Sequence, residues 1–178
     1  MAFEQVRSGR SLSRLQLLAA VALIGLCLFW FVERMERMTA MAEATALELT
    51  IRNARSGAMG ALAGHLLRGD HEAIAGLHHA NPVGTVIGEP SGYIGALRGA
   101  RPENVRPGQW YFDEDNGWLV YHVVNGDYFG QEAGTQARVR MQLQVRFDDR
   151  DGDGAFDAGV DRASGVSVVL LDRPDWRF

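Results

Sequence analysis

LQLLAAVALIGLCLFWFV, residues 15–32, is an unbroken apolar run that contains neither a charged residue nor a proline. At a rise of 1.5 Å per residue, a helix of about 18 residues covers roughly 27 Å, which is close to the thickness of a bilayer's hydrocarbon core. The run is therefore predicted to be a transmembrane helix. It divides the chain into a short basic leader, residues 1–14, and a domain, residues 33–178, on the other side of the membrane.

The charges that flank the run predict its direction. Before it stand Arg7, Arg10 and Arg14 with a single acid, Glu4, whereas the charges of residues 33–37 cancel. Because the cytoplasmic flank of a membrane helix carries the excess of Lys and Arg, the leader is predicted to be cytoplasmic. We expect a single-pass protein of a bacterial inner membrane, with its C-terminal domain in the periplasm.

A cleaved secretory signal is the competing interpretation of the same run. The run is longer than the core of a typical signal, and it ends near the bulky Phe29, Trp30 and Phe31 instead of the small residues of a cleavage site. These features favour an anchor that is kept.

The composition of the rest of the chain limits its partners. About 145 residues follow the run, enough for one domain with one core. The whole chain has a net charge of −4 and the residues up to Val32 contribute +2, so the exported part has about −6. Such an acidic domain, which has no lysine, is not expected to bind nucleic acid. Nothing in it predicts a small-molecule substrate, and the only cysteine, Cys27, lies in the apolar run, so no disulfide is expected.

A helical pattern continues beyond the membrane run to about Leu67. Small and apolar residues recur at spacings of three and four, with charged residues off that stripe. The stripe consists of Ala44, Leu47, Ile51, Ala54, Ala58, Ala61 and His65, with Leu62 and Leu66 beside it. A coiled-coil stalk is the alternative, but so many alanines make a poor seam between helices. We expect the stripe to pack against a sheet of the same domain.

The middle of the chain predicts a short helix and a long loop. Asp70 is a candidate N-cap for a helix that ends near His79, and Asn81-Pro82 stops it. Residues 82–108, rich in Gly and Pro, are expected to form an irregular connection pinned to the sheet by its apolar residues. These anchors are Val86, Ile87, Tyr93, Ile94 and Leu97. The histidines of this region lack companions at zinc-ligand spacing and are expected on helix surfaces; they are His65, His71, His78 and His79.

The last third of the chain predicts strands. Residues 109–113 and 118–124 are aromatic and β-branched runs on either side of a turn that ends in Asn-Gly, a strong hairpin signal. In the run RVRMQLQVRFDD, residues 138–149, apolar and polar residues alternate from Arg138 to Phe147, as they do in a half-buried strand, and a last strand is expected at residues 166–171. The predicted fold class is therefore α+β, with the long N-terminal helix packed on about four antiparallel strands.

One acidic loop, DRDGDGAFDAGVD at residues 149–161, suggests a metal site. Carboxylates at positions 1, 3 and 5, a glycine at 6 and a carbonyl at 7 follow the order of an EF-hand calcium loop, although position 12 is Val160 and the flanks are strands. The candidate ligands are Asp149, Asp151, Asp153, Ala155, Asp157 and Asp161. Because clustered carboxylates repel one another unless a cation bridges them, we expect bound Ca²⁺. An acidic turn without metal is the alternative.

Several motifs resemble the pilin-like proteins of type IV pili and type II secretion systems, and among them the minor pilins of the MSHA type. They are Asn81–Val83, Tyr93–Gly95, Gly108–Asp113 and Leu119–Tyr121. The resemblance implies a membrane helix whose second half packs on an antiparallel sheet. It also implies assembly with other pilin or pseudopilin subunits, and pseudopilins that bind calcium are known.

The leader resembles that of prepilins in its length and its basic charge. Gly9 takes the place of the last leader residue, so that a prepilin peptidase would cut between Gly9 and Arg10. Arg14 stands at the fifth position after the cut, where the family has a Glu that neutralises the amino terminus of a neighbouring subunit. This departure leaves processing open.

Two functions follow from the sequence. The first is a structural subunit, a minor pilin or pseudopilin of a type IV pilus or type II secretion system, anchored in the inner membrane and assembled through its N-terminal helix. The second is an uncleaved accessory or binding domain that stays anchored and faces the periplasm. An enzyme is not expected, because the chain has no Gly-x-Ser-x-Gly elbow and no histidine at triad spacing.

Overall fold

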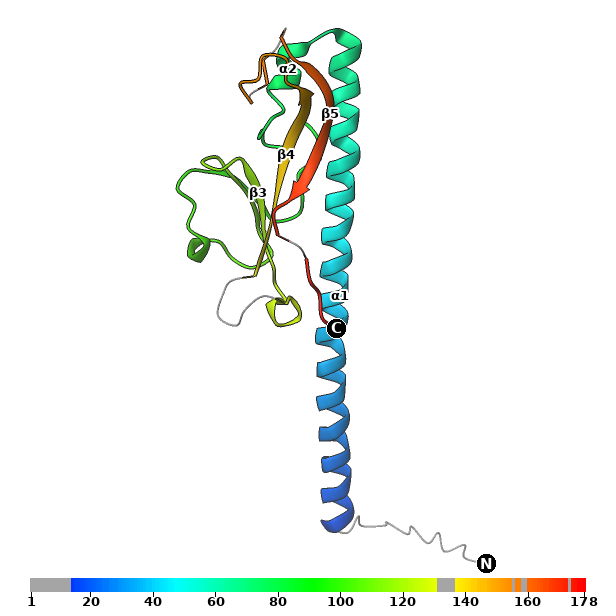
Figure 1. The fold of residues 1–178 in the computed structure, drawn as a ribbon. Coiled ribbons are helices and arrows are strands. Elements are labelled where there is room, and N and C mark those ends of the chain that lie inside the picture. The colour runs from blue at the N-terminus through cyan, green and yellow to red at the C-terminus, as the bar shows by residue number, and fades with distance from the viewer. Residues whose placement is uncertain (1–13, 131–136, 155, 158–159, 173) are drawn as a thin grey trace, which may run out of the picture. The chain divides into compact units, whose positions relative to one another are not determined.

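The computed structural model describes residues 14–130, 137–154, 156–157, 160–172 and 174–178, and the chain divides into two compact units, residues 1–38 and 39–178 (Figure 1). The described part of the first unit is helical and belongs to α1 (Arg14–Arg68). An 18-residue window of this helix has a mean hydropathy of 2.5 and none of it is buried. Within the described residues, α1 is the one helix long and apolar enough to span a membrane, as predicted for residues 15–32.

The second unit begins with the rest of α1, whose inner face carries the predicted stripe. Its buried residues are Ala40, Leu47, Ile51, Ala54, Ala58 and Leu62. Ala44, Ala61 and His65 are half-buried, whereas Leu66 is 47% exposed and does not belong to the stripe. The small side chains let the helix approach the sheet closely, as expected for a helix packed on a sheet.

In the part of the chain that the structure describes, five strands form one sheet in the order β1-β2-β3-β4-β5. They are β1 (Tyr93–Leu97), β2 (Trp110–Asp113), β3 (Trp118–His122), β4 (Arg138–Asp148) and β5 (Arg162–Leu170). The last four are antiparallel, whereas β1 is parallel to β2. The α+β class is confirmed, and β2 to β5 are the four antiparallel strands that were predicted. The parallel edge strand β1 was not predicted.

Alternation along the strands gives the sheet two apolar faces. One face packs with the α1 stripe in the main core, which includes Trp110, Phe112, Leu119, Tyr121, Val139, Met141, Leu143 and Val145. The other face carries a smaller group, here named the second cluster, in which Val105, Tyr111 and Val120 are buried. The connection between β1 and β2, which contains a 3₁₀ turn at Pro102–Asn104, supplies Val105. Another 3₁₀ turn, Gly126–Tyr128, follows β3.

Three boundaries differ from the predictions. Residues 82–108 contain β1, which was predicted as irregular loop; of the expected anchors, Ile87 is buried but Ile94 is 40% exposed. The short helix α2 (His71–Ala75) ends four residues before His79, although Asp70 does cap it by accepting a hydrogen bond from the Ala73 amide. The last strand begins at Arg162 instead of Val166.

Candidate functional site

The acidic loop between β4 and β5 brings three of the predicted ligands together. Carboxylate oxygens of Asp149, Asp151 and Asp153 lie within 4.8 Å of one another, and all three side chains are exposed. This grouping follows from local backbone turns. Gly152 and Gly154 have φ angles of 81° and 79°, which favour glycine, and their amides donate to the two carboxylate oxygens of Asp149 at 2.6 and 2.9 Å.

The carboxylates of this loop have different protonation equilibria. The amides of Gly152 and Gly154 hold the pKa of Asp149 below its ordinary value, because they stabilise the charged form. The pKa of Asp151 is raised: the hydrogen bond from the Asp153 amide opposes the shift, but desolvation and the charges of Asp153 and Asp161 outweigh it. The loop therefore concentrates negative charge at Asp149, where a cation would be favoured.

The other predicted ligands lie differently. Asp161 accepts hydrogen bonds from the amides of Arg150 and Asp157 through its two oxygens, each at 2.9 Å, so it ties the two ends of the loop together. Asp157 is exposed, and Ala155 lies outside the described residues. A carboxylate oxygen that accepts an amide hydrogen bond keeps a lone pair for a cation, so this donor set fits Ca²⁺ without requiring it.

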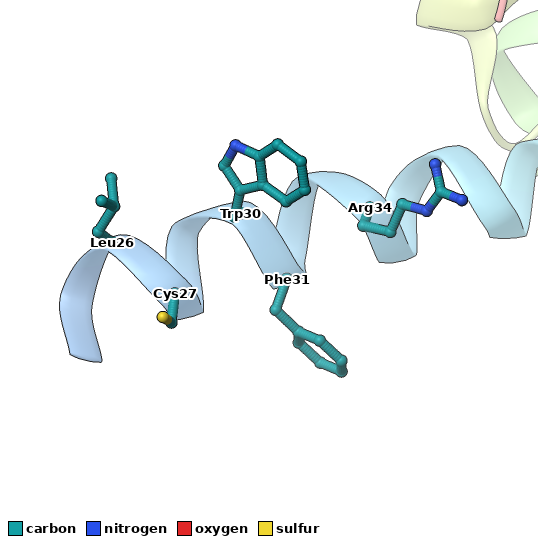
Figure 2. Close-up of a pocket in the computed structure, with 5 residues that line it drawn as sticks. All are labelled: Leu26, Cys27, Trp30, Phe31 and Arg34. Atoms are coloured by element: carbon teal, nitrogen blue, oxygen red, sulfur yellow. The ribbon is translucent and has the colours of Figure 1, made fainter. Parts of the chain in front are cut away.

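A hollow on the apolar part of α1 involves the only cysteine of the sequence, Cys27. Figure 2 shows its lining residues, Leu26, Cys27, Trp30, Phe31 and Arg34, all of which project from α1. No other described element lines the hollow, so it is a groove on the surface of one helix. Its apolar side chains suit lipid or the helix of another copy better than a soluble ligand.

A charged residue of α1 that the sequence placed outside the stripe connects the helix to the sheet. Glu43 accepts hydrogen bonds from the hydroxyl of Tyr121 at 2.8 Å, from the amides of Val124 and Asn125 at 2.6 and 2.9 Å, and from the side-chain amide of Asn125 at 2.6 Å. Burial and this bond to Glu43 raise the pKa of Tyr121 above its ordinary range. Glu43 therefore fixes the end of β3 against α1 through hydrogen bonds with a charged acceptor, which are stronger than neutral ones. A carboxylate one position before Ala44 was the only sequence signal for this contact.

The remaining predicted residues divide into two groups. Gly9 and Arg10, the predicted processing site, lie outside the described residues. His71, His78 and His79 are all exposed, as expected of surface histidines, although His78 and His79 follow α2 instead of lying on it. His78 accepts a hydrogen bond from the Val145 amide at 3.2 Å through Nδ1. The His79 amide donates to the Leu143 carbonyl at 2.9 Å, so this turn is attached to β4.

Comparison with known proteins adds no relative to this description. The chain matches no protein-family model, no curated protein and no solved structure.

Proposed function

We propose that this chain is a structural subunit of a filament of the type IV pilus or type II secretion class, a minor pilin or pseudopilin that is stored in the inner membrane. The observation that carries the proposal is helix α1. Its N-terminal part has a large exposed apolar surface, which is unfavourable in water. Its C-terminal part supplies the inner stripe of an α+β domain. The resemblance of the leader and of the middle third of the chain supports the same class.

The partners follow from the chemistry of the exposed helix. A surface as apolar as residues 15–32 is stable in lipid, where every backbone group is satisfied within the helix, or among helices of the same kind. Other pilin or pseudopilin subunits would provide such helices in a filament. The exported domain would then lie outside the cytoplasm, and its role would be structural instead of catalytic.

Arg14 favours a second candidate, an accessory domain that remains uncleaved and anchored. In the described structure Arg14 is the first residue of α1 and is exposed. An arginine there adds positive charge close to the amino terminus that processing would create, where the family has a carboxylate. The two candidates therefore predict different N-termini.

We predict that a prepilin peptidase removes residues 1–9. When the full chain is co-expressed with such a peptidase, mass spectrometry of the purified protein should find Arg10 as the first residue. Gly9→Val should block the cut, because it changes the last leader residue, and Arg14→Glu should leave it in place, because it restores the residue that the family has there. A chain that keeps Met1 under the same conditions contradicts the filament proposal and supports the accessory domain.

We also propose that the acidic loop binds calcium and orders the connection between β4 and β5. Asp149, Asp151 and Asp153 would supply its carboxylate ligands, and Asp161 holds the loop closed. An ion that binds only the folded state stabilises it by about 2.7 kcal/mol when its concentration is about 100 times Kd. Extracellular calcium sites have Kd values around 10⁻⁴ to 10⁻³ M, so a measurable effect needs millimolar calcium.

Millimolar Ca²⁺ should raise the Tm of the full chain in detergent by several degrees, and Mg²⁺ should raise it much less, because Mg²⁺ demands a tighter octahedron. Asp151→Ala combined with Asp153→Ala should abolish the difference. This variant keeps Asp149 and Asp161, whose hydrogen bonds hold the backbone of the loop. Equal Tm values with and without Ca²⁺, together with no heat of binding by calorimetry, would show that the loop is an acidic turn.

A further inference from the structure

His122, the last residue of β3, is a buried titratable group that no proposal above uses. Its side chain is 1% exposed, and its Nε2 atom has no hydrogen-bond partner. Among the described residues, this Nε2 is the only buried side-chain nitrogen or oxygen without a hydrogen-bond partner. Buried polar atoms are nearly always paired, so an orphan ring nitrogen is a feature that needs an explanation.

The groups around the imidazole do not compensate a positive charge. The ring of Tyr111 on β2 lies 5.9 Å away, and Arg138 on β4 is the residue opposite His122 in the sheet. Burial is the larger cause that lowers the pKa of His122 and the charge of Arg138 is the smaller one, and none of the carboxylates in the described residues opposes them. Arg140, two residues after Arg138 on β4, is a second positive charge near this face, and its charge acts to lower the pKa of Tyr111. The guanidinium of Arg140 pairs with Asp172.

The segment that closes this face of the sheet is attached to His122 by its backbone. The Gly108 amide donates to the His122 carbonyl at 2.7 Å, and the His122 amide donates to the Gln109 carbonyl at 3.0 Å. Three residues before Gly108, Val105 is buried in the second cluster. The charged residues of the segment, Arg98, Arg101, Glu103 and Arg106, are exposed, and Arg98 pairs with Glu114, so none of them is buried beside the imidazole.

We infer that His122 is an acid-sensitive latch: the neutral imidazole lets residues 98–109 close over the second cluster, and protonation releases them. A protonated ring carries a positive charge and donates from both nitrogens. In the closed state it would be a buried cation that has no acceptor at Nε2 and has Arg138 opposite it, and burying such a charge costs free energy. When residues 98–109 lift away, water would reach Nε2, and only the packing of the small second cluster would be lost. The main core and its packing on α1 would be unaffected. The inference is independent of the proposed filament.

The direction of the pH dependence follows from the two states. In the open state the histidine has an ordinary pKa of about 6.5, and in the closed state the pKa is lower, so the open state binds more protons. The closed state is therefore fully stable above about pH 6.5. Below that value, the ratio of open to closed molecules rises by about tenfold per pH unit until the pKa of the closed state is reached.

Hydrogen exchange followed by mass spectrometry tests the latch on the full chain in detergent at pH 7.5, 6.5 and 5.5. Rates are corrected for the pH dependence of intrinsic exchange and compared with those of β5. Peptides that cover residues 98–109 should lose protection by up to about tenfold between pH 7.5 and 5.5, whereas β5 should not. His122→Phe removes the titrating group at similar size, and it should make protection of residues 98–109 independent of pH.

His78→Gln is the matched control, because burial and His79 lower the pKa of His78 as well, yet it lies by β4 at another place in the fold. This variant should keep the wild-type pH dependence of residues 98–109. If His122→Phe does not fold, His122→Gln gives the same comparison with a polar side chain that does not titrate. Protection of residues 98–109 that does not change between pH 7.5 and 5.5 in the wild type, or changes equally in the His122 variant, would overturn the latch.

Discussion

Replacing Leu62 by aspartate is expected to unfold most of the domain formed by residues 39–178. Leu62 is 6% exposed and belongs to the main core, where the α1 stripe packs with the sheet. Truncating a buried leucine costs about 2–5 kcal/mol, and a carboxylate that finds no partner there adds a further penalty. Because domains of this kind are stable by only about 5–15 kcal/mol, the sum is comparable with the whole stability.

Leu49→Asp is the matched control, since Leu49 lies on the same helix but is 57% exposed. Surface substitutions usually change stability by less than about 0.5 kcal/mol, so this variant should keep the wild-type Tm within about 2 °C. Thermal unfolding of both full-length variants in the same detergent, followed by near-ultraviolet circular dichroism, measures the difference. Similar Tm values for Leu62→Asp and Leu49→Asp would contradict the packing of α1 on the sheet.

The elements that sequence periodicity predicted well are those whose signal is local and repeated. The stripe of α1, from Ala44 to His65, repeats over about six helical turns, so one irregular position such as Leu66 does not obscure it. The hairpin between β2 and β3 depends on a turn that ends in Gly117, whose φ angle of 66° favours glycine. These features are confirmed because a helix stripe and a tight turn are determined by neighbours in sequence.

β1 was missed because its partner is distant and its own pattern is weak. It is five residues long, contains Gly95 with a φ angle of 101°, and has a register shift where it pairs with β2. A parallel pairing across a connection of this length leaves no hairpin signal in the sequence. The segment therefore looked like the Gly-rich loop that surrounds it.

Polar contacts, too, could be predicted where they join neighbours in sequence and not where they join distant residues. The proximity of Asp149, Asp151 and Asp153 could be predicted, because they belong to one tight loop. The contact of Glu43 with Tyr121 could not, since it joins residues 78 positions apart. The place of His122 does have a sequence signal: it lies between Tyr121 and Val123 of the main core, so alternation puts it on the second face of the sheet.

The glycines of α1 illustrate how close packing overrides helix propensity. Three glycines, Gly57, Gly60 and Gly64, lie in the last turns of α1, and each costs about 1 kcal/mol relative to alanine in a helix interior. The helix nevertheless continues to Arg68. At Gly57 there is a structural reason for the residue: a Cβ atom there would overlap the carbonyl oxygen of Val86 and lie 3.0 Å from its carbonyl carbon.

Gly57→Ala is therefore expected to destabilise the domain, whereas Gly60→Ala should stabilise it. Residues 82–87 cannot easily move away from a new methyl group, because the amides of Val86 and Ile87 both donate to the Pro82 carbonyl, at 2.8 and 2.9 Å. Overpacking of this kind costs about 1–3 kcal/mol, which exceeds or cancels the gain in helix propensity. At Gly60 a Cβ atom would meet nothing within 4 Å, so only the gain of about 1 kcal/mol remains.

Thermal unfolding of the two full-length variants in one detergent tests the contrast within a single helix turn. Gly60→Ala should raise the Tm by about 3 °C, and Gly57→Ala should lower it or leave it unchanged, since 1 kcal/mol corresponds to roughly 2–4 °C in a domain of this size. Val86 is the contact that distinguishes the two positions, so Gly57→Ala should also increase hydrogen exchange in residues 82–87 while Gly60→Ala should not. An equal rise in Tm for both variants would show that the 82–87 segment does not press on α1, and the close approach at Gly57 would then have no part in holding the helix to the domain.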